Sequence, residues 1–248
     1  MNGLTKRQRS TKAAEGARPA PRKRTPAPTR KERSVNSTQN DGLDGGAGSI
    51  RDQVIAFKRE QIINAAVDLF YDNGYQRTTL DAVAERLGVT KPFIYYHFKD
   101  KEEILAEISR RSIAHANDAL EEALATTGRP SERLYSVVRT ITRSTLKWRR
   151  YTAIFFREQK NLSEQARQPL YSMHRKFDGM LTKLLEEGVR TGEFRVTDPA
   201  LTSLALAGMI GWAYNWYRPE GRLSVEVICD RMAEMALNLV GAKPERSD

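Results

Sequence analysis

The sequence predicts an all-α protein, and three observations support this fold class. From Val54 onward the apolar residues recur with the period of an α-helix nearly everywhere. No segment alternates apolar and polar residues for long enough between turn residues to predict a β-strand. Glycines, prolines and capping residues divide the pattern into segments of helical length. The single cysteine, Cys229, excludes an intramolecular disulfide and favours an intracellular protein.

The first 50 residues differ from the rest of the chain. They are rich in Pro, Arg, Lys, Ser, Thr and Gly, and they contain eleven Lys or Arg against four acids. They therefore carry seven of the ten net positive charges. With few large apolar side chains to bury, we expect residues 1–50 to be disordered, like residues 242–248. Two interpretations of the tail remain open: a basic arm attracted to DNA, or a solvated extension with no dedicated role.

The first two helices have clear ends. Asn73-Gly74 is a typical stop signal for the first helix. Thr79 is placed to cap the second helix. The inward faces of the two helices are predicted to comprise Ile62, Ala65, Ala66, Leu69 and Phe70, then Leu80, Val83, Ala84 and Leu87.

A short turn, Gly88-Val89-Thr90, separates the second helix from a third. Thr90 is a candidate N-cap, and Pro92 falls in the first turn, where a missing N–H does no harm. A helix, a three-residue turn with glycine and another helix have the spacing of a helix-turn-helix motif.

The third helix is unusually rich in rings. Ile94 and Phe98 are four residues apart, about 40° around the helix, and can pack inward together. We expect Phe93, Tyr95, Tyr96 and His97 to face outward. Tyrosine and threonine hydroxyls and the Lys91 ammonium can donate hydrogen bonds to DNA phosphate oxygens. The Phe93 ring can make an apolar contact with a thymine methyl group. The alternative is a buried aromatic helix covered by another part of the chain.

Six further helices are predicted. The fourth opens at Asp100, with Glu103 completing a variant capping box, and runs to about Leu124. The fifth follows Thr127-Gly128-Arg129-Pro130. The others are expected at about Ala153 to Gln159, Ser163 to Arg190, Asp198 to Tyr217, and Ser224 to Gly241. The last helix should direct Val225, Ile228, Met232, Met235 and Leu239 inward.

The segment TTLDAVAERLGVTKPFIYYHFKDKEEIL, Thr78 to Leu105, resembles the DNA-binding signature of TetR-family transcriptional regulators. The resemblance covers roughly 50 residues and implies a homodimer that reads a palindromic DNA operator. It also implies a helical C-terminal domain that binds a small effector and dimerises through its last two helices. We therefore expect a helix-turn-helix domain over 51–101 and a ligand-binding and dimerisation domain over 102–241.

The resemblance also implies roles in DNA binding. The expected phosphate contacts are Thr79, Tyr95, His97 and Lys101. The base-facing or groove-facing set is Lys91, Pro92, Phe93 and Tyr96, next to Thr90 at the helix start. Phe93 departs from the small residue common at its position in the family.

No charged residue occurs over the nineteen positions from Pro199 to Tyr217. The segment is marginal in length for a membrane span and contains polar residues, so we favour a helix buried on all sides. Its small residues would let a partner helix approach closely, and the last helix would supply the other surface. The residues concerned are Ala205, Ala207, Gly208, Gly211, Met232 and Met235. We therefore predict a dimer interface here.

Aromatic residues and methionines of the C-terminal half could line an effector pocket, although rings at helical spacing are more often core. The candidates are Arg149, Phe155, Phe156, Met173, His174, Phe177, Trp212, Asn215 and Trp216. WAYNWYRPEG, Trp212 to Gly221, resembles a feature of family members that control acyl-CoA, fatty-acid or steroid degradation. For a coenzyme A thioester, Arg149, Arg150 and Arg157 are candidate phosphate partners; the alternative is a solvated basic turn.

Catalysis has little support. The three histidines lie far apart in sequence, and no nucleophile, metal-binding or phosphate-loop motif occurs. We predict no cofactor and no metal. With the resemblance to TetR-family regulators, we expect a cytoplasmic, dimeric, ligand-responsive transcriptional regulator, as a repressor released by a small apolar or acyl-CoA-like effector. The alternative is an all-α enzyme or scaffold that uses the helix-turn-helix only structurally.

Overall fold

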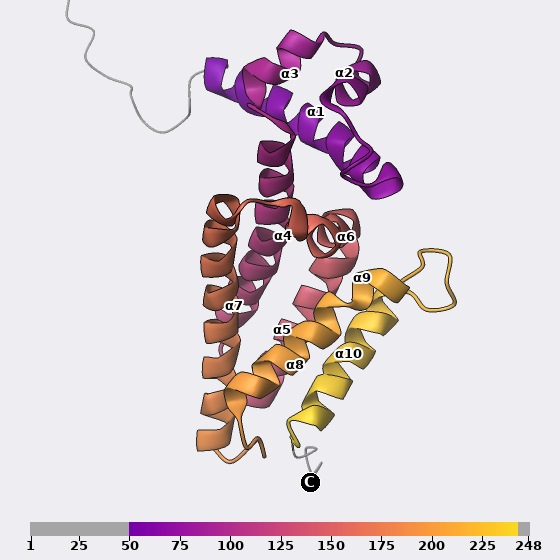
Figure 1. Cartoon of the computed structure of the whole chain (residues 1–248). Coiled ribbons are helices and arrows are strands. Elements are labelled where there is room, and N and C mark those ends of the chain that lie inside the picture. The colour runs from indigo at the N-terminus through magenta and orange to yellow at the C-terminus, as the bar shows by residue number, and fades with distance from the viewer. Residues whose placement is uncertain (1–49, 243–248) are drawn as a thin grey trace, which may run out of the picture. The chain divides into compact units, whose positions relative to one another are not determined.

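The computed structural model describes residues 50–242. Within these residues the chain forms α-helices and one short 3₁₀ turn, with no strand, which confirms the predicted fold class (Figure 1). The predictions of disorder for residues 1–49 and 243–248 lie outside the described residues. Ala242 is partly buried against the C-terminal core.

Three helices form the N-terminal bundle: α1 (Ile50–Asn73), α2 (Leu80–Leu87) and α3 (Lys91–His97). Their buried apolar residues form one core with the start of α4 and with α6. Gly74 and Gly88 have φ of 83° and 65°, which explains why glycine follows α1 and α2.

Helix α4 (Lys101–Leu124) runs from this bundle into the C-terminal part of the chain (Figure 1). The remaining elements are α5 (Pro130–Lys147), α6 (Arg149–Glu158), η1 (Gln159–Asn161), α7 (Glu164–Arg190), α8 (Pro199–Gly211), α9 (Ala213–Trp216) and α10 (Val225–Leu239). A second apolar core joins α4, α5, α7, α8 and α10.

Most of the predicted caps are present. The side chains of Thr79, Asp100, Asp198 and Ser224 each accept a hydrogen bond from a backbone N–H in the first turn of α2, α4, α8 and α10. Thr90 precedes α3, as predicted, but its side chain makes no capping hydrogen bond. The first turn of α3 therefore depends on Pro92 and on packing rather than on a side-chain cap.

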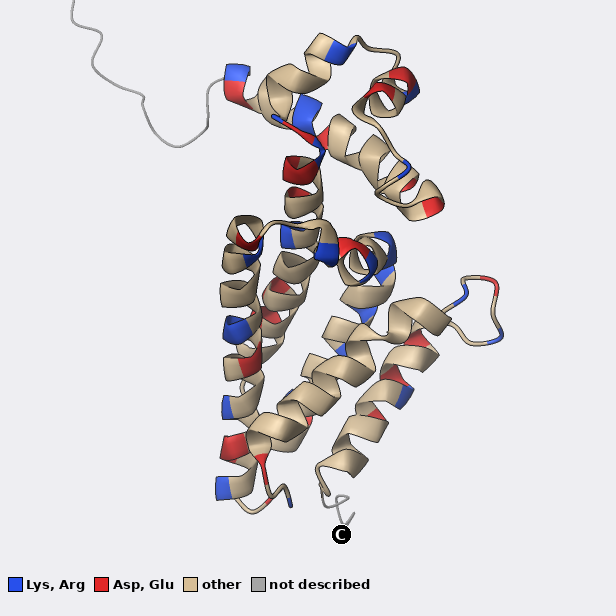
Figure 2. Ribbon diagram, viewed as in Figure 1, with Lys and Arg blue, Asp and Glu red and all other residues tan. Residues whose placement is uncertain are grey.

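The apolar segment after Asp198 is shorter as a helix than predicted. Helix α8 ends at Gly211, Trp212 caps it, and a single further turn follows as α9. Figure 2 shows α8 without any charged residue. None of the helices between residues 50 and 242 is both long enough and apolar enough to cross a bilayer.

Helix α10 packs mainly on α5, and its inward face is narrower than predicted. Ile228 and Met232 are buried, whereas Met235 and Leu239 are each 49% exposed. The prediction that all of these residues point inward is therefore wrong for the last two. One face of α10, with Met235 and Leu239, is therefore exposed.

Candidate functional site

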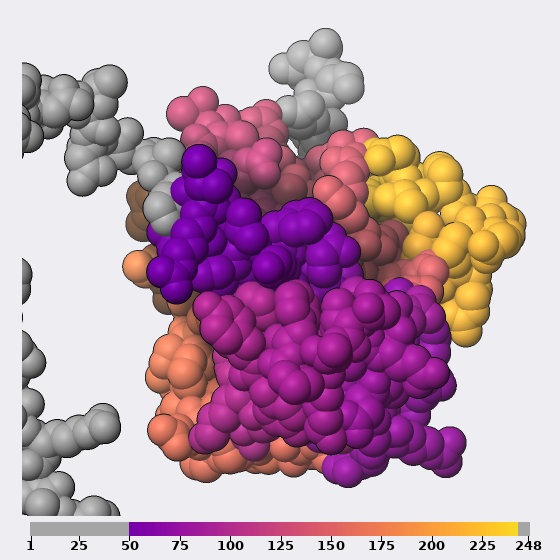
Figure 3. Space-filling model, turned by 90° about the horizontal axis from the view of Figure 1, so that it is seen from above, coloured from indigo at the N-terminus to yellow at the C-terminus, as the bar shows by residue number. Residues whose placement is uncertain are grey.

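Helix α3 divides its side chains between core and surface. Ile94 and Phe98 are buried, whereas Tyr95 and Tyr96 are 49% and 68% exposed. In Figure 3 the atoms of α1 to α3, coloured indigo to magenta, form the surface nearest the viewer. The Lys91 ammonium lies 2.9 Å from an Asp81 carboxylate oxygen, and this hydrogen bond raises the pKa of Lys91. Two tyrosine hydroxyls and one positioned cation are thus available at this surface.

His97 does not face outward as predicted. It is buried, and its ring makes edge contacts with Phe93 and Tyr96, each with 5.0 Å between ring centroids. Burial lowers the pKa of His97, and the nearby Lys58 and Arg59 lower it further. In this position the imidazole contacts the two neighbouring rings and is not exposed to solvent. Phe93 is half-buried, with the Lys58 ammonium 5.6 Å from its ring centroid.

Lys101 is engaged within the protein. Its ammonium donates hydrogen bonds to the backbone carbonyls of Tyr75 (2.8 Å) and Thr78 (2.9 Å), and it lies 4.1 Å from the Tyr75 ring centroid. Burial lowers its pKa. These bonds hold the start of α4 against the loop between α1 and α2. Thr79, Thr90 and Pro92 are exposed, as expected.

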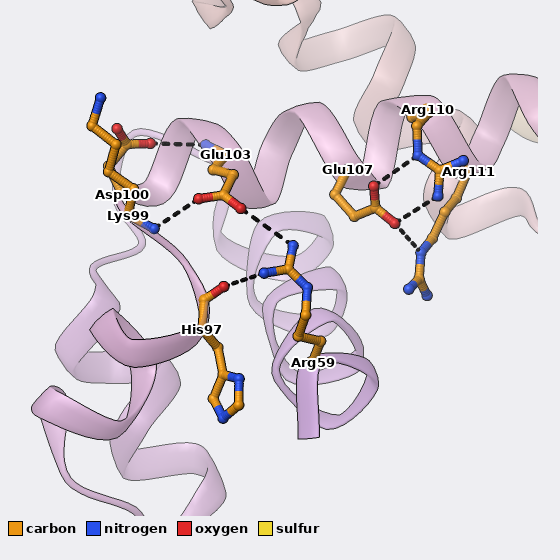
Figure 4. A network of polar contacts seen from close by, with 8 residues as sticks. All are labelled: Arg59, His97, Lys99, Asp100, Glu103, Glu107, Arg110 and Arg111. Carbon is orange, nitrogen blue, oxygen red and sulfur yellow. Dashed lines mark hydrogen bonds and ion pairs between the residues drawn. The ribbon is translucent and has the colours of Figure 1, made fainter. Parts of the chain in front are cut away.

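A polar network that the sequence analysis missed ties α1, α3 and α4 together (Figure 4). The Arg59 guanidinium donates to the backbone carbonyl of His97 and, at 3.2 Å, to a carboxylate oxygen of Glu103. The other Glu103 oxygen accepts from the backbone N–H of Lys99 at 2.7 Å. The Asp100 and Glu103 pattern indicated a helix start, but no sequence signal indicated Arg59. The C-terminal end of α3 is thereby fixed to the first turn of α4.

The C-terminal part contains a pocket of about 450 Å³ between α4, α5, α6, α7 and α8. Four of the predicted effector residues line it: Phe155, Phe156, His174 and Phe177. Other residues that line the pocket were not predicted from the sequence, among them Ser112, His115, Thr145, Trp148, Thr152, Tyr171, Asp178 and Leu204. The small polar residues on the otherwise apolar faces of α4 and α5 were the sequence signal that could have predicted this pocket. A mostly apolar pocket with a few polar groups is typical of small-molecule sites.

Two histidines and one aspartate line this pocket. His115 stacks on Trp148, with 3.9 Å between ring centroids and planes 8° apart. Burial lowers the pKa of both His115 and His174, and burial raises the pKa of Asp178. Burial thus favours the neutral form of each group, which can give or accept hydrogen bonds without a charge.

The other predicted effector residues do not line this pocket. Arg149 lies in an adjoining groove. Met173 packs against the N-terminal core. Trp212 and Trp216 are 54% and 45% exposed, and Asn215 is also exposed. The helix ends at Gly211, and the chain changes direction through the single turn of α9.

Two family models match the chain: "Bacterial regulatory proteins, tetR family" at residues 62–108, and "Tetracyclin repressor-like, C-terminal domain" at residues 127–240. The TetR-family regulator PfmR from Thermus thermophilus is 30% identical, with a TM-score of 0.67 over 71% of this chain and 97% of PfmR. The chain belongs to the TetR family.

Other TetR-family proteins are similar along most of their length. The repressor KstR2 from Mycolicibacterium smegmatis is 26% identical over 175 residues, which are 70% of this chain and 85% of KstR2. AibR, solved with isovaleryl coenzyme A and operator DNA, is 26% identical with a TM-score of 0.65, over 72% of this chain and 97% of AibR.

Membership of the TetR family decides the broad function. These proteins are DNA-binding transcriptional regulators that respond to ligands and form dimers. The alternative of an enzyme, or of a scaffold that uses the motif only structurally, is set aside because the family and the similar proteins are regulators.

Proposed function

We propose that this protein is a cytoplasmic, homodimeric repressor, released from a palindromic operator by a small apolar or acyl-CoA-like effector. Residues 51–101 are the DNA-binding domain, and residues 102–241 bind the effector and the second subunit. The tail before residue 51 adds salt-sensitive attraction to DNA.

The observation that carries this proposal is the course of α4. In its first turn Glu103 accepts from Arg59 of α1, which also bonds the His97 carbonyl of α3, whereas Ser112, His115 and Ala116 further along α4 line the pocket. From Glu103 to Ser112 a helix rises about 14 Å. A ligand that displaces the middle of α4 therefore also acts on the helices that carry the exposed tyrosines. Such a ligand changes DNA affinity by as much as its affinity differs between the two arrangements.

Helix α3 enters the major groove in this proposal. The contacting residues are Thr79, Thr90, Lys91, Pro92, Phe93, Tyr95 and Tyr96. Hydroxyls and the ammonium bind phosphates or base edges, and the exposed part of the Phe93 ring meets a thymine methyl group. His97 and Lys101 act by holding α3 and α4 in place. Two-fold symmetry requires half-sites about 34 to 36 Å apart.

The second subunit binds to α8 and α10. Leu201 and Leu204 on α8 are 63% and 55% exposed, and Met235 on α10 is 49% exposed. Ala205 and Gly208 on the same helix are small and exposed, so a partner helix can approach closely there. Met232 is buried in the subunit's own core, so it has no part in this interface.

The pocket binds the effector. Rings from α6 and α7 contact its apolar part, and His115, His174 and Asp178 supply the polar contacts that orient it. The names of similar proteins favour the repressor assignment and the acyl-CoA class, since KstR2 is a repressor and AibR was solved with isovaleryl coenzyme A.

The test is selection of bound duplexes from a random library, then fluorescence anisotropy of the selected duplex in excess competitor DNA. We expect a palindromic sequence with nanomolar affinity, about 10³-fold or more tighter than random DNA. Absence of any selected sequence at low salt would contradict the proposal.

A further inference from the structure

A second hollow, which we call the cationic groove, adjoins the effector pocket. It has a volume of about 620 Å³ and lies between α1, the junction of α5 and α6, and the start of α10. Four cations and one acid line it: Arg143, Lys147, Arg149, Arg150 and Asp68. Trp148 lines both the groove and the effector pocket. The two sites are therefore neighbours that share one aromatic side chain.

Two of the four cations have no acidic partner among residues 50–242. Arg143 pairs with Glu226, and Arg150 pairs with Asp68. Lys147 and Arg149 instead lie near aromatic rings, 5.5 Å from the Trp148 centroid and 5.8 Å from the Tyr217 centroid. Unpaired cations beside partly exposed aromatic rings suit a phosphate group attached to a planar ring system.

We propose that the cationic groove binds the phosphate-bearing part of a nucleotide-like ligand. This inference rests on the proposed function, because Trp148 would then separate the charged part of the ligand from an acyl part in the effector pocket. The phosphates can come from the coenzyme A part of one acyl thioester or from a separate nucleotide. Both carry the same chemistry to Lys147 and Arg149.

The groove also connects to the DNA-binding helices through Asp68 of α1. One Asp68 carboxylate oxygen accepts from Arg150 of α6, and the other accepts from Arg86 of α2 at 3.0 Å. A phosphate beside Arg150 competes with Asp68 for the guanidinium and repels the Asp68 carboxylate. Binding in the groove therefore weakens the link between α6 and α1, and DNA affinity falls with it.

The experiment measures binding of three probes to the full chain by isothermal titration calorimetry: octanoyl-CoA, coenzyme A and octanoate. The groove variant is K147Q/R149Q. Its matched control is K183Q/R190Q, which removes one exposed Lys and one exposed Arg on α7 that line neither site. Thermal melts of both variants check folding.

We expect K147Q/R149Q to weaken octanoyl-CoA binding about 10-fold or more and to leave octanoate binding unchanged. The affinity for octanoyl-CoA should also depend less on salt concentration in this variant. The control should match the wild type. If octanoyl-CoA binds more tightly than coenzyme A, one thioester spans both sites. If the two bind equally, and octanoate binds independently, the phosphates come from a separate nucleotide. If K147Q/R149Q binds octanoyl-CoA and coenzyme A with the same affinities as the wild type, the proposal is overturned.

Variant D68N tests the link to DNA. We expect it to bind octanoyl-CoA at least as well as the wild type, while octanoyl-CoA changes its operator affinity by a smaller factor. An unchanged factor would overturn the role of Asp68. Ligand-free operator binding by the wild type is measured alongside: its absence counts against the proposed function, whereas ligand binding without dependence on the groove counts against this inference alone.

Discussion

Helices α3 and α8 both expose large side chains, but of different kinds. Helix α3 exposes Tyr95 and Tyr96, whose rings end in hydroxyls, next to Lys91. Helix α8 exposes Leu201 and Leu204, which have no polar atom in their side chains. A tyrosine can face water or phosphate at little cost, whereas an exposed cluster of leucines gains free energy only against another apolar surface.

In the proposed function the two surfaces have different partners. The hydroxyl-bearing rings of α3 suit a hydrated, charged duplex, and the aliphatic face of α8 suits a second copy of the chain. Changes on α8 should therefore act through the dimer, and changes on α3 should act on DNA directly.

The largest effect is expected from L201E/M235E, which places charges on the exposed faces of α8 and α10. Burying these carboxylates against a partner costs more than the interface gains, so the dimer should dissociate. Operator affinity should fall by about 100-fold or more, because the two half-sites are no longer bound together. Analytical ultracentrifugation and anisotropy measure the two effects. V189E, which charges an exposed position on α7, is the control and should remain dimeric.

I94A should remove core packing between α3 and the rest of the N-terminal bundle. Ile94 is fully buried, so truncation should lower the free energy of unfolding by about 2 to 5 kcal/mol. Chemical denaturation measures the loss, and Y96A is the comparison. If I94A and Y96A unfold at the same denaturant concentration, the division of α3 into core and surface is wrong.

K101A should lower the stability of the protein, rather than remove a direct contact with DNA. Lys101 donates to two backbone carbonyls that would be left without a partner, so we expect a loss of about 1 to 3 kcal/mol in unfolding free energy. K99A removes an exposed ammonium two residues away and should leave stability unchanged. A K101A protein with wild-type stability and weakened DNA binding would instead restore Lys101 as a phosphate contact.

Y96F removes only a hydroxyl from the exposed face of α3. Operator affinity should fall about 5-fold, the effect of roughly one hydrogen bond, with no change in melting temperature or in the dimer. Anisotropy at two salt concentrations measures it. A loss of dimer in Y96F would show that α3 and α8 do not act separately.

The smallest effect concerns pH. Burial lowers the pKa of His97, His115 and His174, so the unfolded chain binds protons more readily than the folded chain. Stability should therefore decrease as pH falls below about 6.5, the ordinary histidine value, and the decrease should be smaller in H174N. Denaturant midpoints at several pH values measure it. An identical pH dependence in H174N would contradict a neutral His174.

The helix boundaries of the N-terminal bundle could be predicted because their signals are local. Thr79 and Asp100 cap helices within three residues of themselves, and Gly88 has the positive φ that its turn needs. The outward direction of Tyr95 and Tyr96 followed from helical spacing alone.

The roles of His97, Lys101 and Arg59 could not be predicted, because each depends on elements distant in sequence. His97 is buried against rings and cations from α1 and α3, and Lys101 reaches carbonyls more than twenty residues earlier. Lys101 has the same formal charge whether it faces phosphate or carbonyl oxygens. The end of α8 was likewise missed, since Trp212 to Trp216 continue the apolar pattern while the backbone turns.

The most direct test of the account is anisotropy of the selected operator with the wild type, Y96A and L201E/M235E in excess competitor DNA. We predict specific binding by the wild type, weak binding by a dimeric Y96A, and weak binding by a monomeric L201E/M235E. Operator binding by Y96A with wild-type affinity and selectivity would contradict the claim that the exposed face of α3 reads DNA.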